Sequence, residues 1–166
     1  MKKGTVRLAV LTAALATLFA ATPAGAQQKK TTLGLDAAKK MAAACEQHAR
    51  KEGWNMVIAI VDDGGTLKHF SRMDNAFRAS VDISQLKANT SSGFPRSTRQ
   101  VGEIARERAP GIVHVPGIVT FAGGLPIVTA TGEHIGAIGV SGGTSDQDEV
   151  CAQAGLDAVK SELNLK

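Results

Sequence analysis

The pattern of apolar positions is most informative in the last third of the chain. Two apolar runs of similar length, residues 125–130 and 134–140, flank a short turn that contains Gly132. Matched runs around a glycine-containing turn predict an antiparallel β-hairpin. Gly136 and Gly139 lie inside the second run, where a glycine weakens a strand and usually marks the close approach of another group. We expect that group to be a packed helix, with a bound ligand as the alternative.

A glycine loop and a helix start follow the hairpin. Gly142 and Gly143 end the second strand, and Thr144 precedes a segment, residues 145–163, with the pattern of a closing helix. Thr144 and Gln147 have the spacing of a capping box, which satisfies free backbone N–H groups at a helix N-terminus. The same N–H groups can instead bind an anion, so Gly142, Gly143 and Thr144 are candidate ligand-binding residues. A turn with a helix cap is the alternative, and we favour it because the loop lacks the lysine of a phosphate-binding loop.

Helical and strand-like segments also succeed one another through the first two thirds of the chain. In order, the expected elements are a helix at Leu35–Glu52, a buried strand at 56–61, a more polar strand at 66–73, a helix at 79–92, a shorter helix at 97–108 and a loop at 112–119 that leads into an edge strand. Antiparallel strands with helices on their faces are typical of the α+β class. The pattern predicts one α+β domain with an antiparallel sheet of about five strands.

The first 26 residues have the features of a secretory signal peptide. A basic start precedes an apolar run at 8–21, and Ala24-Gly25-Ala26 matches a cleavage site. Cleavage after Ala26 leaves one domain, residues 27–166, which we expect to be periplasmic or extracellular. The apolar run is too short to span a bilayer comfortably, although an uncleaved anchor is the alternative. No second apolar run of spanning length follows, so we expect no membrane span in the mature protein.

Net charge argues against a nucleic-acid partner. The full chain has 19 Lys and Arg against 15 Asp and Glu, but the first 26 residues contain three of the basic residues and no acidic ones. The mature chain is therefore nearly neutral, and the basic character of the precursor is no sign of nucleic-acid binding. A basic patch interleaved with aromatic residues is also missing from the sequence, which has no Tyr and a single Trp, Trp54.

Several motifs together resemble the GlcG/HbpS family of haem-binding GlcG-like proteins, which is related to the C-terminal domain of PduO-type proteins. The motifs are VIAIVDDGGTLKHFSRMDNA, SVDISQLKANTSSGF, GGLPI and GEHIGAIGVSGGTSDQDE. The resemblance covers roughly residues 33–163 and identifies a family better than it identifies a reaction. It implies a profilin-like antiparallel sheet flanked by helices, haem or a related tetrapyrrole as the ligand, and assembly into a homo-oligomer.

Four histidines could supply a ligand to haem iron: His48, His69, His114 and His134. His48 lies at the edge of the apolar stripe of the first helix, where a histidine can face a surface cleft beside apolar cover. The resemblance implies a haem-ligating histidine on that helix, and His48 matches it best. His114, in an apolar loop, is a second candidate. A boundary histidine without a ligand and a loop histidine with a structural hydrogen bond are the alternatives for these two positions, and we expect His69 and His134 to be solvated.

Charged residues near the predicted strands and at the closing helix form two further sets. We expect Arg72 and Asp74 to pair and fix loops, with a small-ligand role as the alternative. Asp146 and Glu149 have an i, i+3 spacing. The resemblance allows this acidic pair to contact iron, whereas favourable placement at a helix N-terminus is the interpretation that we favour.

The two cysteines, Cys45 and Cys151, fall on the apolar faces of the first and the closing helix. Export would place them where a disulfide can persist. Against a bridge, the two helices might cover different faces of the sheet, and free cysteine is common as a small core residue. We therefore expect two buried, unreactive thiols, with an intramolecular bridge as the alternative.

Sequence motifs exclude several common activities. The chain has no nucleophile elbow, Walker loop, dinucleotide-binding fingerprint or zinc-binding Cys/His spacing. The resemblance implies an exported haem-binding protein for haem carriage, protection or redox sensing. The first alternative is an enzyme or accessory protein acting on a small carboxylate or a diol-derived metabolite, and the second is an oligomeric scaffold without a ligand.

Overall fold

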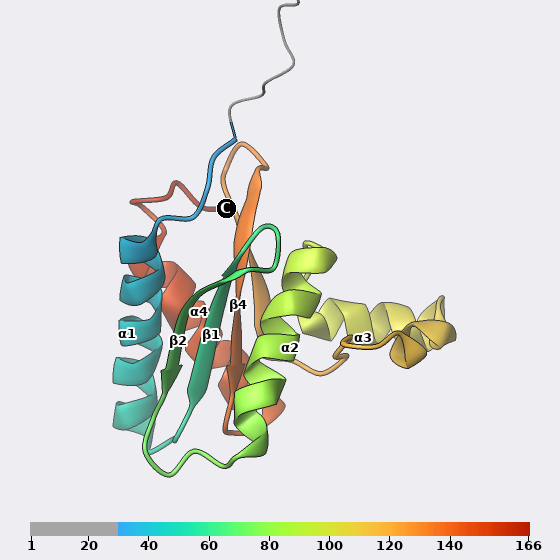
Figure 1. Ribbon diagram of the computed structural model, residues 1–166, viewed down its shortest axis with the longest axis horizontal. Helices are drawn as coiled ribbons and strands as arrows, with labels where there is room; N and C mark the ends of the chain where they lie inside the picture. The colour runs from blue at the N-terminus through green and yellow to red at the C-terminus, as the bar shows by residue number, and fades with distance from the viewer. Residues whose placement is uncertain (1–29) are drawn as a thin grey trace, which may run out of the picture. The chain divides into compact units, whose positions relative to one another are not determined.

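The computed structural model describes residues 30–166, so the predicted signal peptide lies outside the described residues. The described elements fall in one compact unit, Thr31–Lys166. In chain order they are α1 (Leu35–Glu52), β1 (Val57–Asp62), β2 (Leu67–Arg72), α2 (Ala79–Gly93), α3 (Thr98–Glu107), the 3₁₀ helix η1 (Pro110–His114), β3 (Gly124–Val128), β4 (His134–Ser141) and α4 (Ser145–Val159). Figure 1 shows helices on both faces of a central sheet, which confirms the α+β class.

The sheet of the described chain has four antiparallel strands in the order β2-β1-β4-β3. The predicted hairpin is present as β3 and β4, with Leu125 opposite Ile138. The loop expected at residues 112–119 is present, as the end of η1 and the irregular segment after it, but no fifth strand follows it in the described chain before β3 begins at Gly124. Pro110 and Pro116 cannot donate to a strand ladder, and Val113 and Val115 are exposed rather than buried. These features keep the segment out of the sheet.

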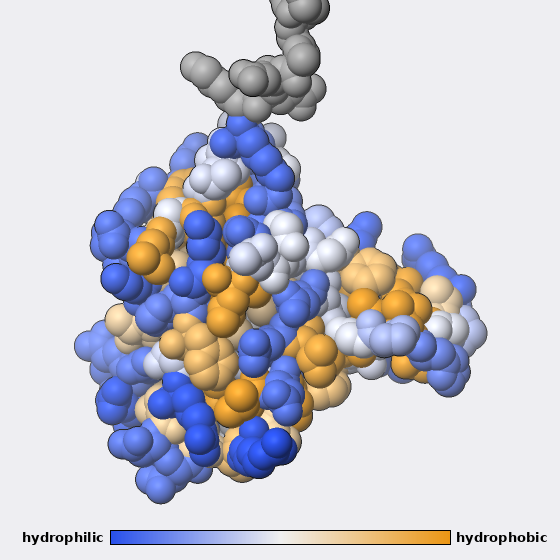
Figure 2. Space-filling model, viewed as in Figure 1, coloured by the Kyte–Doolittle hydropathy of each residue, from blue (hydrophilic) through white to orange (hydrophobic). Residues whose placement is uncertain are grey.

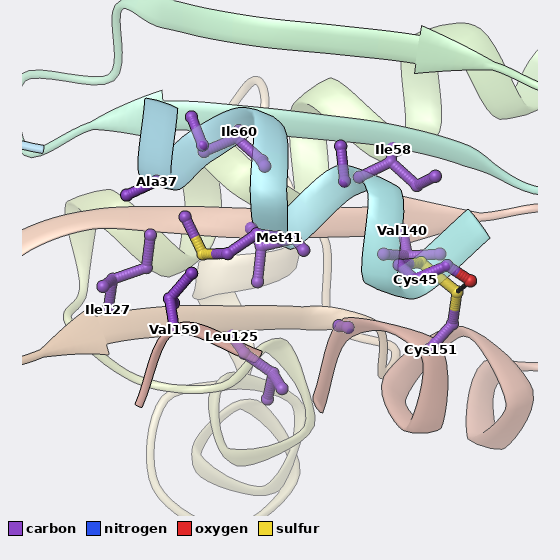
Figure 3. Close-up of a cluster of buried hydrophobic side chains, with 14 of the residues drawn as sticks. Ala37, Met41, Cys45, Ile58, Ile60, Leu125, Ile127, Val140, Cys151 and Val159 are labelled. Atoms are coloured by element: carbon purple, nitrogen blue, oxygen red, sulfur yellow. Dashed lines mark hydrogen bonds between the residues drawn. A yellow bond between two sulfur atoms is a disulfide. The ribbon is translucent and has the colours of Figure 1, made fainter. Parts of the chain in front are cut away.

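Large aliphatic side chains fill the space between the sheet and the helices α1 and α4. Figure 3 shows Ile58 and Ile60 of β1, together with Val140 of β4, facing Met41 of α1. All four side chains are fully buried. Burial of each such side chain stabilises a fold by about 1.5–3 kcal/mol. This face is the main core of the protein.

Small residues cover the opposite face of the sheet, under α2. The residues there include Ala59, Ala137 and Gly139. A Cβ atom at Gly139 would lie 2.1 Å from the carbonyl oxygen of Ser84 on α2. The glycine inside the predicted strand therefore marks a helix that lies directly on the sheet, as expected, rather than a ligand.

A disulfide joins α1 to α4, so the expectation of two free thiols is wrong. The Sγ atoms of Cys45 and Cys151 are 2.02 Å apart. Both helices lie on the same face of the sheet, and Figure 3 shows the two cysteines facing one another. Gly155 of α4 permits this close approach, because a Cβ there would lie 2.9 Å from the carbonyl oxygen of Met41. The objection that the helices cover different faces does not hold.

The helix α3 and η1 form an arm that extends away from the sheet in Figure 1. Ser97 begins α3 with a capping box that includes Gln100. Apolar residues gather on this arm in Figure 2, where Val113 and Val115 are about half exposed. Within residues 30–166, no helix has the length and apolar character needed to cross a bilayer.

Candidate functional site

The C-terminal end of α1 brings His48 against the ring of Trp54. Gly53 ends the helix in the left-handed region, with φ 73°, and the N–H of Trp54 then donates to the carbonyl of Ala49 at 2.8 Å. This turn folds Trp54 back toward the helix. The ring centroids of His48 and Trp54 are 5.5 Å apart, with an interplanar angle of 64°. Both side chains are half-buried. The part that remains accessible forms an edge of the surface that combines an imidazole with an aromatic ring.

A surface pocket of about 260 Å³ lies beside this edge. We call it the Trp54 pocket. Its lining residues come from the end of α1 and from the turn after β2: Arg50, Gly53, Trp54, Asn55, Met73, Asp74 and Asn75. Apart from Trp54, Met73 and Gly53 the lining is polar, and it includes the Arg50 guanidinium, which also donates to Glu46 at 2.9 Å. The pocket can therefore hold the polar edge of a ligand, while Trp54 covers an apolar part.

The donor set of this edge suits haem better than a bare metal ion. A protein site for a bare ion usually needs several ligating side chains, and residues 30–166 contain no group of three His, Cys, Asp or Glu side chains placed to hold one. Haem brings four nitrogen ligands of its own and needs only one or two from the protein. A half-buried histidine whose described contact is an aromatic ring fits that requirement.

The other histidines lie elsewhere in the fold. His114 ends η1 on the protruding arm and is exposed, on the opposite side of the sheet from α1. His69 is half-buried on β2 opposite Ile60. His134 begins β4 and is also half-buried; its Nε2 atom is buried without a hydrogen-bond partner in the described chain. The structure therefore does not bring His114 and His48 together, and the ligand roles of both stay predictions.

The glycine loop at Gly142, Gly143 and Thr144 already binds an anion of the protein itself. The N–H of Gly143 donates to Oδ1 of Asp148 at 2.9 Å. The hydroxyl of Thr144 accepts from the N–H of Gln147, whose side chain accepts from the N–H of Thr144, so the predicted capping box is confirmed. An external anion at this loop would have to compete with Asp148. A ligand-binding role for these three residues remains a prediction.

A buried ion pair at this loop was not predicted. The Nζ atom of Lys87 on α2 lies 2.6 Å from Oδ2 of Asp148 and 3.0 Å from the carbonyl oxygen of Val140. The ring of Phe121 lies over the same ammonium, with 4.9 Å between Nζ and the ring centroid. The side chains of Lys87 and Asp148 are 0% and 4% exposed. This arrangement satisfies the donors of the lysine and ties α2 to β4 and to the start of α4.

Desolvation governs the protonation of this pair. Burial lowers the pKa of the Lys87 ammonium from its ordinary value of 10.5 and raises the pKa of the Asp148 carboxyl from 3.8. The hydrogen bond between the two groups opposes both shifts, and the N–H groups of Gly142 and Gly143 also favour the carboxylate. The pair is therefore costly to form but more costly to leave with one partner missing.

Gly123 lies directly against this pair. It adopts φ 120°, which L residues with a side chain rarely adopt, and a Cβ atom there would lie 2.7 Å from Nζ of Lys87 and from Cβ of Asp148. Gly123 and the Gly142-Gly143 loop therefore lie at the same buried cluster around Lys87 and Asp148. The cluster has a clear structural role, because every polar atom in it has a partner within the protein.

One signal in the sequence points to the buried face of α2. The large apolar residues of α2, Val81, Ile83 and Leu86, are only half-buried. Fully buried positions instead follow a stripe of helical spacing: Ser80, Ser84, Lys87 and Ser91. The serines at i, i+4 and i+11 of this stripe are small enough to lie against a glycine- and alanine-rich sheet face. The lysine in that stripe then requires a buried carboxylate.

Of the charged sets singled out in the sequence, Asp146 and Glu149 bind a cation of the protein, whereas the described chain shows no ion pair between Arg72 and Asp74, so that expected pairing is wrong. Arg99 of α3 donates to Asp146 at 2.5 Å and to Glu149 at 2.7 Å, so this acidic pair binds a cation of the protein. Arg72 donates to the carbonyl of Ala76 at 2.9 Å and fixes the turn after β2. Asp74 lines the Trp54 pocket.

Comparisons with known proteins agree with this fold. The model of the family described as haem-degrading protein HbpS-like matches residues 33–157. Protein GlcG of Escherichia coli (strain K12) is 38% identical over 112 residues, which are 68% of this chain and 83% of GlcG. A crystal structure of a Streptomyces reticuli HbpS double mutant is similar with a TM-score of 0.75 and 34% identity, over 84% of this chain and 98% of that one. A crystal structure of a PduOC–haem complex is similar with a TM-score of 0.74 and 27% identity, over 82% of this chain and 98% of that one.

Proposed function

The chain belongs to the HbpS-like family of haem-degrading proteins, and on that premise we propose that it binds haem through His48. The pairing of His48 with Trp54 at the edge of α1 carries the proposal. The imidazole would ligate the iron, and the indole would cover part of the ring. Arg50 and the asparagines of the Trp54 pocket would receive its carboxylates. Similarity to a structure with haem bound supports this ligand.

The proposed haem site is shallow. The Trp54 pocket, at about 260 Å³, is smaller than the 300–1,000 Å³ that typically encloses a drug-sized ligand. Haem would therefore lie against the surface, with one edge in the pocket and the rest open. An open site suits a protein that transfers haem or senses its redox state better than one that encloses haem permanently.

Export is the second part of the proposal. We infer that the leader with Ala24-Gly25-Ala26 is removed and that the mature protein works in the periplasm or outside the cell as a homo-oligomer. A disulfide between Cys45 and Cys151 supports an oxidising compartment. N-terminal sequencing of the exported protein should begin at Gln27. A chain that keeps Met1 and stays in the cytoplasm would refute this part alone.

A hemin titration tests the central proposal. Purified mature protein should give a saturable shift of the Soret band at a stoichiometry of one hemin per chain. A slow loss of the shifted band in the presence of a reductant would further indicate turnover of the bound haem rather than storage. Unsaturable absorbance that grows linearly with hemin would indicate nonspecific adsorption and would refute the proposal.

A further inference from the structure

A second pocket lies far along the sheet from the His48 site, where the edge strand β3 meets α4 and the end of the described chain. Its volume is about 260 Å³. The lining residues are Pro126, Val128, Gln153, Leu156, Asp157, Lys160, Leu165 and Lys166. The segment after α4 closes one side, because Leu165 pairs with Thr129 and the N–H of Lys166 donates to the carbonyl of Val128 at 3.2 Å. We call it the β3–α4 pocket.

The floor of the β3–α4 pocket is apolar. Leu156 and Leu165 are half-buried and pack against the main core, so the floor is part of a rigid structure. Val128 and Pro126 add the edge of the sheet. Proline has no N–H group, and therefore this part of the edge cannot pair with an added peptide strand along its whole length. A small molecule suits the pocket better than an extended peptide.

The rim of the pocket is cationic. Lys160 and Lys166 are exposed, and neither forms a salt bridge within residues 30–166. Asp157 is the acidic residue of the lining, and its carboxylate accepts from the side chain of Gln153 at 2.8 Å along the helix surface. Among the side chains of the lining, two ammonium groups stand against one carboxylate, which favours an anion beside the lysines.

These features together define a ligand class. We propose that the β3–α4 pocket binds a small monocarboxylate with an apolar body. The carboxylate lies between Lys160 and Lys166, and the body lies on Leu156 and Val128. A volume of about 260 Å³ corresponds to roughly nine water-sized groups at about 30 Å³ each. Straight-chain acids of about six carbons, or benzoate, match that size. This site is independent of the haem site and needs no haem to form.

Titration with hexanoate tests the proposal in the absence of hemin. In ¹H–¹⁵N spectra of the ¹⁵N-labelled mature protein, hexanoate should shift the amide signals of Val128, Leu156 and Lys166 in a saturable manner. Hexylamine, with the same chain and the opposite charge, should shift them at least about tenfold more weakly. The exposed double variant Lys160→Ala/Lys166→Ala should weaken hexanoate binding by a similar factor, whereas Lys51→Ala at the far end of α1 should not change it.

Three results would overturn the proposal. The first is the absence of saturable shifts at these residues, and the second is equal binding of hexanoate and hexylamine. The third is unchanged affinity in the Lys160→Ala/Lys166→Ala variant with its fold intact by circular dichroism. None of these results bears on hemin binding, which the Soret titration measures separately.

Discussion

The ammonium nitrogen of Lys87 lies 2.6 Å from a carboxylate oxygen of Asp148 in a part of the interior that solvent does not reach. The two residues are 61 positions apart in the chain and belong to helices on opposite faces of the sheet. The pair therefore passes through the plane of the sheet at its edge, beside Gly123. It connects the two helical layers directly.

Removal of one partner from this pair should destabilise the protein more than removal of both. Lys87→Met leaves Asp148 buried and unpaired, so we expect a loss of about 3–5 kcal/mol in the free energy of unfolding. Lys87→Met/Asp148→Asn keeps an acceptor for the N–H of Gly143 and should recover most of that loss. Urea unfolding of the three proteins measures the difference. Additive losses in the double variant would mean that the pair is not coupled.

The loss in the free energy of unfolding caused by Lys87→Met should depend on pH. Loss of the lysine removes a group that favours the carboxylate, so the pKa of Asp148 in the folded variant should rise further above 3.8. The folded variant then binds a proton more tightly than the unfolded chain, and its stability falls as pH rises from 3.8 through the folded pKa. Unfolding free energies of the variant and the parent should differ less near pH 4 than at pH 7. An equal loss of stability at pH 4 and at pH 7 would contradict the assigned role of Asp148.

The disulfide should contribute measurably to stability. Replacement of both Cys45 and Cys151 by alanine removes a bridge between positions 106 residues apart, and the chain-entropy model gives a loss of up to about 4–5 kcal/mol. Thermal and urea unfolding compare this variant with the parent. Thiol counting on the denatured parent without reductant should find no free thiol. Two free thiols would show that the bridge does not form in the isolated protein.

Glycines under α2 should tolerate no side chain. Gly139→Ala places a methyl group 2.1 Å from the carbonyl oxygen of Ser84, which forces the helix off the sheet and should cost about 1–3 kcal/mol or more. Gly93→Ala is the matched control, because a Cβ atom at the exposed end of α2 has nothing within 4 Å. Its stability should stay within about 0.5 kcal/mol of the parent. Equal effects of the two substitutions in urea unfolding would argue against direct contact between α2 and β4.

His48→Ala should weaken hemin binding or change the Soret spectrum more than His69→Ala does. His48 contacts the ring of Trp54, which lines the neighbouring pocket, whereas His69 lies on β2. If the imidazole ligates iron, its loss should weaken binding at least about tenfold, or about 1.4 kcal/mol. Hemin titrations of the His48, His69, His114 and His134 single alanine variants give the comparison. An unchanged spectrum in all four would point to a ligand other than histidine.

Features that depend on neighbouring residues were predictable from the sequence. The first helix spans Leu35–Glu52 as expected, because Gly53 supplies the left-handed residue that ends it. The hairpin and the capping box at Thr144 also follow from patterns only a few residues long. In each case the partners of a hydrogen bond lie close together in the chain, so spacing alone brings them together.

Features that depend on distant contacts were not predictable. The bridge between Cys45 and Cys151 requires α1 and α4 to share a face of the sheet, which no local pattern determines. Burial of Lys87 depends on a carboxylate 61 residues away and on small residues of the sheet beneath it. The expected fifth strand is absent from the described chain for a related reason, because the chain after the loop at 112–119 runs directly into β3, and no local pattern determines how many strands join the sheet.

The bridge between α1 and α4 has a mechanical consequence. All four strands, α2 and α3 lie between the two bridged cysteines in the chain. A pulling force applied before α1 and after α4 would first break the pairing of the C-terminal segment with the end of β3 and would then pass through the sulfur–sulfur bond. In a stretching experiment, only the segments outside the bridge would lengthen while it is intact, and the chain between the two cysteines, which contains the whole sheet, would extend only after reduction.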